Sequence, residues 1–311
     1  MLERLYQFGQ LAVDALIAVL MVFVNLLPET LAEPFQYAFM QRALLTALVV
    51  GGICGMLSSF VILKRWSLLG DAISHAVLPG VAIAYLLGWP FFIGAFVTGA
   101  LTSVGIGFIE HNTRIKADAA MGLMFTAAFA VGIVIISQIQ TSTHLMHILF
   151  GNVLGVGPET LMLTLVAGVI ALLAVLLFYK ELFLYTFDSV QARTQGLNIT
   201  VLHYGLILLL TMTIVASLET VGIVLVVAML VTPGATAYLL VNSLPRMIWL
   251  GAAIGMLSAV VGLYLSFLFN VASGGAIVLV ASAIFALALV FAPRQGLLRR
   301  WLSRSRIRLA D

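Results

Sequence analysis

Asp71 and His75 stand four residues apart in the apolar stretch "SLLGDAISHAVLPGVAIAYLLG", which covers residues 67–88. In an α-helix this spacing places both side chains on one face, about one turn apart. A carboxylate at the centre of a bilayer costs roughly 2.5–3.5 kcal/mol on insertion scales, so Asp71 should face a cavity or a partner rather than lipid. A carboxylate oxygen and an imidazole nitrogen on one face can bind the same cation. Spacing alone leaves three interpretations open: a metal path, a structural hydrogen-bonded pair and a proton relay.

Pro79 follows this pair and adds a further candidate group. A proline has no N–H, so it removes the helical hydrogen bond to the carbonyl four residues earlier, which here belongs to His75. A carbonyl freed at membrane depth needs a cavity, water or an ion. The stretch can therefore bring a carboxylate, an imidazole and a backbone carbonyl together.

A second irregular segment, "SLETVGIVLVVAMLVTPGATA", has Glu219 at its start and Pro233 near its inner part. Spans interrupted by proline or glycine in both halves of a transporter point to its translocation route. Glu219 is a candidate gating or coordinating acid, or alternatively an interfacial carboxylate at the start of a helix. His144 and His147, in the outer loop, are candidates for passing a cation inward or contacting an external partner, or are ordinary interfacial side chains.

The composition predicts a polytopic membrane protein. The chain has 311 residues, of which 63% are hydrophobic and 9% charged. In soluble domains about a quarter of the residues are charged, so most of the surface of this chain must face lipid. The predicted fold class is an all-α transmembrane bundle. Its nine core spans are predicted at 42–63, 67–88, 90–109, 118–138, 160–178, 200–217, 221–241, 247–269 and 275–292. The N-terminal stretch 11–27 is predicted to cross as a tenth span rather than to lie in the interface.

The positive charges predict the orientation. With the N-terminus in the cytoplasm and alternating spans, all but one of the 15 lysines and arginines fall on the cytoplasmic side, Arg42 being the exception. We therefore expect both termini inside. The basic tail at 294–311 is typical of a segment that anchors at the anionic inner leaflet. The single cysteine, Cys54, excludes an internal disulfide framework.

The longest inner loop predicts a docking element. No GxxxxGK[ST] motif occurs, so the chain binds no nucleotide through a P-loop. The loop contains "FDSVQARTQGLN", residues 187–198, in which Asp188 can cap a short helix, Ala192 offers a small surface and Gly196 can end the helix. A short exposed helix of this kind suits a groove of another protein, although an ordinary polar loop remains the alternative.

The chain resembles the membrane permeases of ATP-binding-cassette importers for zinc, manganese and iron. Four motifs carry this resemblance in family order between about residues 37 and 292. They are "MQRALLTALVVGGICGMLSSFVILKRWSLLGDAISHAVLPGVAIAYLLG", "ILFGNVLGV", "FDSVQARTQGLN" and "LETVGIVLVVAMLVTPGATAYLL". The organisation expected from this is an N-terminal extension (1–36), a permease domain (37–293) and the basic tail (294–311).

The resemblance implies a homodimeric pore in the bacterial cytoplasmic (inner) membrane. It implies two copies of a cytoplasmic ATP-binding subunit and an extracytoplasmic metal-binding protein as partners, with no nucleic acid involved. ATP would be hydrolysed on the partner, so the chain itself would be no enzyme and would hold no permanent cofactor. Asp71 and His75 would line the metal path, and the segment from Phe187 and Asp188 to Gly196 would couple the pore to the ATPase.

The identity of the metal is less strongly indicated. One carboxylate and one imidazole suit Mn²⁺, Fe²⁺ and Zn²⁺ alike, and the lack of a thiolate weighs against copper. The wording "DAISHAVLPG" resembles manganese- and iron-type members more than zinc-type members, so manganese is favoured. Two alternatives stay open, an ion-coupled secondary metal carrier and a cassette permease for a chelate such as a siderophore. An intramembrane metalloenzyme is disfavoured because no HExxH motif occurs.

Overall fold

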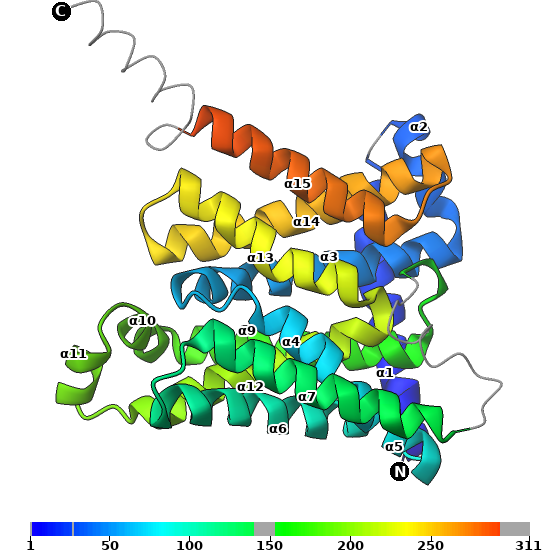
Figure 1. Ribbon diagram of the computed structural model, residues 1–311. Coiled ribbons are helices and arrows are strands. Elements are labelled where there is room, and N and C mark those ends of the chain that lie inside the picture. The colour runs from blue at the N-terminus through cyan, green and yellow to red at the C-terminus, as the bar shows by residue number, and fades with distance from the viewer. Residues whose placement is uncertain (1, 27, 140–152, 293–311) are drawn as a thin grey trace, which may run out of the picture.

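The computed structural model describes residues 2–26, 28–139 and 153–292 (Figure 1). Throughout those ranges the secondary structure is helical, and strands do not occur. The helices in chain order are α1 (Leu2–Val24), α2 (Glu29–Ala32), η1 (Glu33–Gln36), α3 (Ala38–Leu63), α4 (Leu69–Ala76), α5 (Leu78–Leu87), α6 (Phe91–Asn112), α7 (Ala117–Ser137), η2 (Val153–Gly155), α9 (Pro158–Leu177), α10 (Tyr179–Phe187), α11 (Ser189–Thr194), α12 (Ile199–Val221), α13 (Ile223–Leu240), α14 (Leu244–Phe269) and α15 (Ser273–Phe291).

Nine helical segments in the described ranges are long and apolar enough to cross a membrane, α4 and α5 counting as one. They coincide with the nine predicted core spans, which confirms the transmembrane bundle. The boundaries move by a few residues at most, as where α3 begins at Ala38 and α12 continues to Val221. Left-handed residues mark two helix ends: Gly88 (φ 66°) follows α5 and Asn270 (φ 51°) follows α14.

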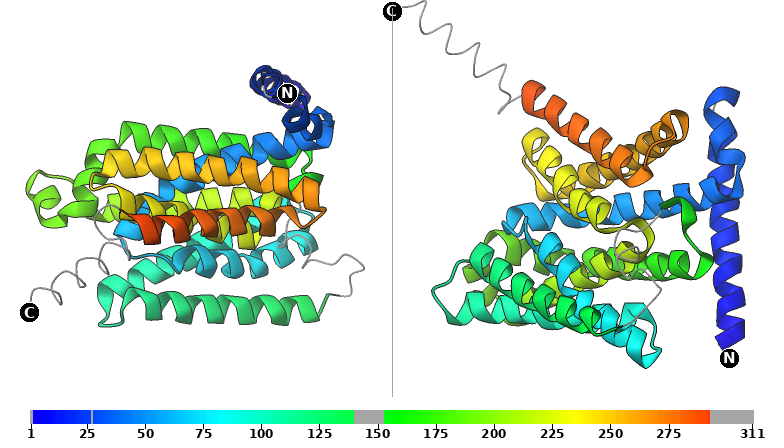
Figure 2. Two further views of the ribbon diagram at one scale, coloured as in Figure 1. Left: turned by 90° about the horizontal axis from the view of Figure 1, so that it is seen from above. Right: turned by 45° about the vertical axis from the view of Figure 1, so that its right-hand side comes forward.

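Helix α1 runs across the ends of the spanning helices instead of alongside them (Figures 1 and 2). The apolar part of α1, Gly9–Val24, is shorter than a typical span. Its Val13 is buried in a small cluster with Leu45 of α3 and Leu161 of α9, which holds the helix at that end of the bundle. The structure therefore differs from the predicted tenth crossing, and the cytoplasmic N-terminus, which required that crossing, loses its support.

Helix α3 forms the centre of the bundle and packs along α13 and α14. Gly51 and Gly55 of α3 lie directly against Gly251 and Gly255 of α14, so that the two backbones touch. A Cβ atom added to Gly51 would stand 2.7 Å from the carbonyl oxygen of Gly255, closer than real Cβ atoms approach. Small residues spaced four apart on both helices are the usual means of close helix packing in a membrane, where no hydrophobic driving force acts between helices.

We expect Gly255→Val to lower the thermal unfolding midpoint of the purified protein in detergent. The added side chain would meet the carbonyl of Gly51 and push α14 away from α3, and overpacking of this kind typically costs about 1–3 kcal/mol. Gly205→Val on α12 is the matched control, because a Cβ there meets no atom within 4 Å. Equal midpoints for the two variants would contradict the close α3–α14 contact.

Candidate metal-binding and coupling sites

The Asp71–His75 pair lies on α4, immediately before a break in the second of the nine spans. Oδ1 of Asp71 is 3.5 Å from Nε2 of His75, so the predicted shared helix face is confirmed. Helix α4 ends at Ala76 and α5 begins at Leu78, with Pro79 in the first turn of α5. Proline suits that position because the first helical N–H groups have no partner within their own helix. The predicted interruption by Pro79 is therefore present one turn after the pair.

The pair is partly exposed on the single chain. The side chain of Asp71 is 49% exposed and that of His75 is 31% exposed. On one side the imidazole contacts two rings of α7, Phe125 and Phe129, at centroid distances of 5.3 and 5.5 Å. These rings give the imidazole an apolar wall, while the carboxylate keeps an open side towards the surface of the chain.

Within the described residues, no third side chain of a metal-ligating type joins the Asp71–His75 pair. The described residues contain no group of three or more His, Cys, Asp or Glu side chains close enough to hold one metal ion. The pair thus supplies one oxygen ligand and one nitrogen ligand, whereas protein metal sites commonly use four to six ligands. A metal ion at this pair would therefore need further ligands from elsewhere.

The structure places Glu219 differently from the sequence-based expectation. The residue does not start a helix but lies half-buried in the last turn of α12, just before Gly222 (φ 83°) separates α12 from α13. The interruption predicted for this segment therefore falls at Gly222. Only a glycine adopts such a backbone conformation readily, so Gly222 fixes the sharp change in direction.

Pro233 does not interrupt its helix. It is buried inside α13, which continues through it, and the following Gly234 lies against the backbone of α3. A Cβ atom on Gly234 would stand 2.6 Å from the carbonyl carbon of Ser58. The Pro-Gly pair thus serves the packing of α13 on α3. The other two candidates, His144 and His147, lie outside the described residues.

The predicted docking helix is present as α11, at the end of the bundle where α10 and α11 project (Figure 1). The carboxylate of Asp188 accepts a hydrogen bond from the backbone N–H of Gln191 at 2.8 Å, which is the expected cap. Gly196 follows with φ 82°. Ala192, however, is fully buried inside the chain, so its small surface faces the bundle and not a partner.

Two apolar side chains that the sequence did not single out as a surface are exposed here. Val190 is 73% exposed and Phe187 is 56% exposed. Both lie in the predicted coupling segment, but only Phe187 is predicted there by name, whereas Val190 is not singled out. The one feature of the sequence that could have indicated Val190 is that it is an apolar residue among polar neighbours in "FDSVQARTQ". Phe187, the last residue of α10, and Val190 of α11 are thus exposed apolar side chains of the predicted docking segment.

A polar cluster that the sequence did not reveal joins this region to the bundle. Lys64, which ends α3, donates a hydrogen bond from Nζ to the backbone carbonyl of Tyr185 at 2.9 Å and stands 3.4 Å above the Tyr185 ring. The hydroxyl of Tyr185 is 2.8 Å from Nδ1 of His203 on α12. The His203 ring in turn meets the edge of Trp66, with centroids 5.4 Å apart. We refer to Lys64, Trp66, Tyr185 and His203 as the inner cluster.

Burial shifts the acid–base properties of the inner cluster. It lowers the pKa of the Lys64 ammonium to about 8, with the carboxylate of Glu110 opposing part of the effect. It raises the pKa of the Tyr185 hydroxyl above its usual range, and Glu110 adds to that rise. A Lys64 with a lowered pKa still donates to the Tyr185 carbonyl when neutral, so this bond does not depend on the charge.

Comparison with known proteins gives consistent matches over most of the chain. The model of the ABC 3 transport family matches residues 36–292. The manganese transport system membrane protein MntC of Halalkalibacterium halodurans is 54% identical over 267 residues, covering 86% of this chain and 91% of the relative. A probable iron transport system membrane protein of Haemophilus influenzae is 48% identical over 263 residues, covering 85% and 97%.

A solved structure agrees with these relatives. A chain of PsaBC from Streptococcus pneumoniae, in complex with Fab, superimposes with a TM-score of 0.78 at 44% sequence identity. The match covers 87% of this chain and 98% of that one. At this identity the likeness extends to the sequence as well as to the arrangement of the helices.

We expect Tyr185→Phe to loosen α10 without unfolding the bundle. The change keeps the ring below Lys64 but removes the hydroxyl that meets His203, and a buried hydrogen bond of this kind is worth about 1 kcal/mol. Hydrogen–deuterium exchange of the backbone in residues 179–198 should rise several-fold. Tyr204→Phe is the control, because the hydroxyl of Tyr204 makes no hydrogen bond to any residue in the described ranges. The same exchange rates in both variants would mean that the inner cluster does not hold α10.

Proposed function

The chain belongs to the ABC 3 transport family, and from this premise we propose that it is the membrane permease of an importer that carries a divalent metal ion, manganese above iron or zinc, into the cytoplasm. ATP hydrolysis would take place on two cytoplasmic partner subunits, and an extracytoplasmic binding protein would deliver the ion. The manganese preference rests on relatives named for manganese transport at 54% identity, beside one named for iron at 48%.

The observation that carries this proposal is the Asp71–His75 pair beside a helix break in an apolar span. An acid at membrane depth is expensive and is placed there for a function in most membrane proteins. The carboxylate and the imidazole are both ligands that Mn²⁺ accepts. Two ligands per chain bind loosely, which a conducting site requires because the ion must also leave it.

A second copy of the chain would complete the site. Two copies related by two-fold symmetry would bring two carboxylates and two imidazoles to one ion, and the two negative charges would balance a divalent cation. The partial exposure of both side chains on a single chain fits this arrangement. The aromatic wall formed by Phe125 and Phe129 would exclude water from one side of the ion.

The inner cluster suggests how ATP hydrolysis reaches this site. Movement of α11 on the ATPase would move α10 and its Tyr185, which is bound to Lys64 at the end of α3. From Lys64 the chain reaches α4 in five residues, through a turn held by the bond from the N–H of Leu69 to the carbonyl of Trp66. Helix α4 bears Asp71 and His75, so a shift of α10 would be passed to the metal ligands through packed and hydrogen-bonded groups.

We expect Asp71→Asn and His75→Ala each to reduce uptake of radioactive Mn²⁺ at least tenfold in vesicles that contain the whole transporter. The first change removes a negative charge that offsets the cation and the second removes the nitrogen ligand, while both side chains are exposed enough that the fold should remain. Asp118→Asn, at the exposed start of α7, is the matched control and should transport normally. Normal uptake by either correctly assembled site variant would reject the metal site.

Stimulation of the ATPase by a ferric chelate, but not by Mn²⁺, would support the chelate permease instead.

We expect Val190→Arg to release the ATPase from the purified complex. An exposed apolar side chain on a docking helix becomes a charged one, and loss of a central apolar contact typically costs about 2 kcal/mol or roughly 30-fold in affinity. Val201→Arg is the control, because Val201 is also exposed near this end of the bundle, on α12. Binding of the ATPase would be measured by pull-down. If Val190→Arg and Val201→Arg retain equal amounts of ATPase, α11 is not the docking element.

A further inference from the structure

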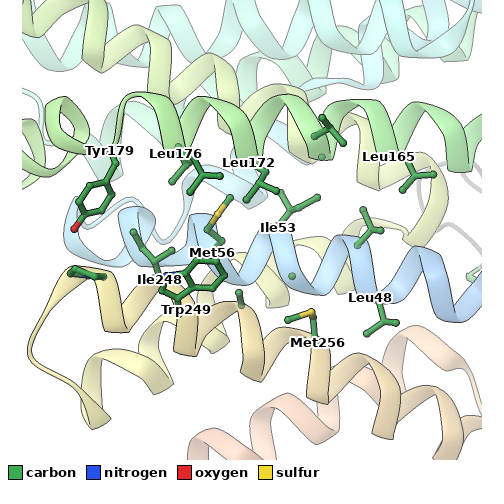
Figure 3. A pocket seen from close by; sticks show the side chains of 17 residues that line it. Leu48, Ile53, Met56, Leu165, Leu172, Leu176, Tyr179, Ile248, Trp249 and Met256 are labelled. Atoms are coloured by element: carbon green, nitrogen blue, oxygen red, sulfur yellow. The ribbon is translucent and has the colours of Figure 1, made fainter. Parts of the chain in front are cut away.

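An apolar groove of about 720 Å³ runs along the bundle between α3, α9 and α14 (Figure 3). Its walls are side chains such as Leu48, Leu165, Leu172 and Trp249, which Figure 3 shows directed into the space between the three helices. A glycine, Gly52, forms part of the floor. A Cβ atom there would stand 3.4 Å from Cγ of Met256, so the position can accept a side chain that projects into the groove.

The groove is far from the metal ligands. α9 and α14 lie towards one edge of the bundle seen from above, and α7, which packs on His75, lies along the opposite edge (Figure 2). Trp249 is 67% exposed on the groove side. The groove thus opens sideways on spanning helices, where the surrounding medium is lipid.

At its inner end the groove continues into a second cavity of about 630 Å³. The two cavities share Tyr179 and Pro245 as lining residues. The second cavity adds polar residues to an otherwise apolar lining, because Gln195, Asn242 and Ser243 line it beside residues such as Phe183 and Leu184. Of the residues that line it, Lys180 alone is charged.

We propose that these two cavities form one binding site for an anionic phospholipid of the inner leaflet, with an acyl chain in the groove and the phosphate beside Lys180. From Leu165 to Leu176 the groove follows α9 for about 17 Å at 1.5 Å per residue, which exceeds the roughly 15 Å depth of one leaflet. The polar lining residues appear beyond the end of α9 at Leu177, where headgroups lie.

The charge of the lining selects the headgroup. Lys180 would attract a net negative headgroup, and the neutral amide and hydroxyl groups nearby would hydrogen-bond its phosphate oxygens. A zwitterionic lipid would gain less, because its own positive group competes with Lys180. A bound lipid would connect α10 to the turn between α13 and α14, since both line the polar cavity.

The test uses the fluorescence of Trp249 in the full-length chain, taken as the difference between the parent protein and Trp249→Phe. The protein is placed in phosphatidylcholine vesicles with rising fractions of phosphatidylglycerol or phosphatidylcholine whose acyl chains carry bromine, which quenches tryptophan on contact. We expect brominated phosphatidylglycerol to reach half-maximal quenching at a mole fraction at least threefold lower than brominated phosphatidylcholine.

Two pairs of variants separate the groove from the headgroup cavity. Gly52→Phe fills the groove and should cut the quenching by both lipids, whereas Gly205→Phe, on an exposed part of α12, should not. Lys180→Gln should remove the preference for phosphatidylglycerol while leaving the quenching by phosphatidylcholine. Lys116→Gln, before α7, should leave both curves unchanged.

Three results would overturn the proposal. If both lipids give the same quenching curve in the parent protein, Trp249 contacts only the ordinary lipid that surrounds the bundle. If Lys180→Gln still prefers phosphatidylglycerol, the anionic lipid is attracted to the basic end of the bundle in general and not to Lys180. Quenching that appears only after deletion of residues 1–27 would mean that the chain's own N-terminal helix fills the groove.

Discussion

The energetic cost of a carboxylate in an apolar span is the constraint on which the rest of this structure depends. Asp71 cannot face lipid without a penalty of roughly 2.5–3.5 kcal/mol, and its own chain covers only about half of its side chain. The imidazole of His75 lies one turn from this acid, the aromatic side chains of α7 pack on that imidazole, and the helix breaks at Val77 directly after it. In our proposal, a metal ion and a second copy of the chain cover the exposed half of the Asp71 side chain and balance its charge.

The rest of the bundle connects the Asp71–His75 pair to the end where α10 and α11 project. Contact between the backbones of α3 and α14 at paired glycines fixes the central helix without the need for polar groups. The inner cluster then ties the end of α3 to α10 through Lys64 and Tyr185. A movement at α11 has therefore a continuous path of bonded and packed groups to α4, and the proposed lipid would add a second attachment of α10 to the bundle.

Much of the fold was predictable because hydropathy and periodicity are local signals. The nine spans, the break at Pro79, the one-turn spacing of Asp71 and His75 and the cap by Asp188 all follow from residues close in sequence. What failed depended on neighbours distant in sequence. α1 lies across the bundle because α3 and α9 offer a place to pack, and the inner cluster joins Lys64 to Tyr185, more than 100 positions away. The burial of Ala192 depends on how α11 packs beside α10 and α12, which the pattern of the segment itself does not indicate.

The central claim, that the ion is held by imidazole and carboxylate groups from two copies, can be tested by pulsed electron paramagnetic resonance of Mn²⁺ bound to the complete transporter. With ¹⁵N-labelled histidine, our account predicts nitrogen hyperfine coupling from two equivalent imidazoles per Mn²⁺, lost altogether in His75→Ala. Bound Mn²⁺ without any nitrogen coupling, or coupling that persists unchanged in His75→Ala, would contradict it.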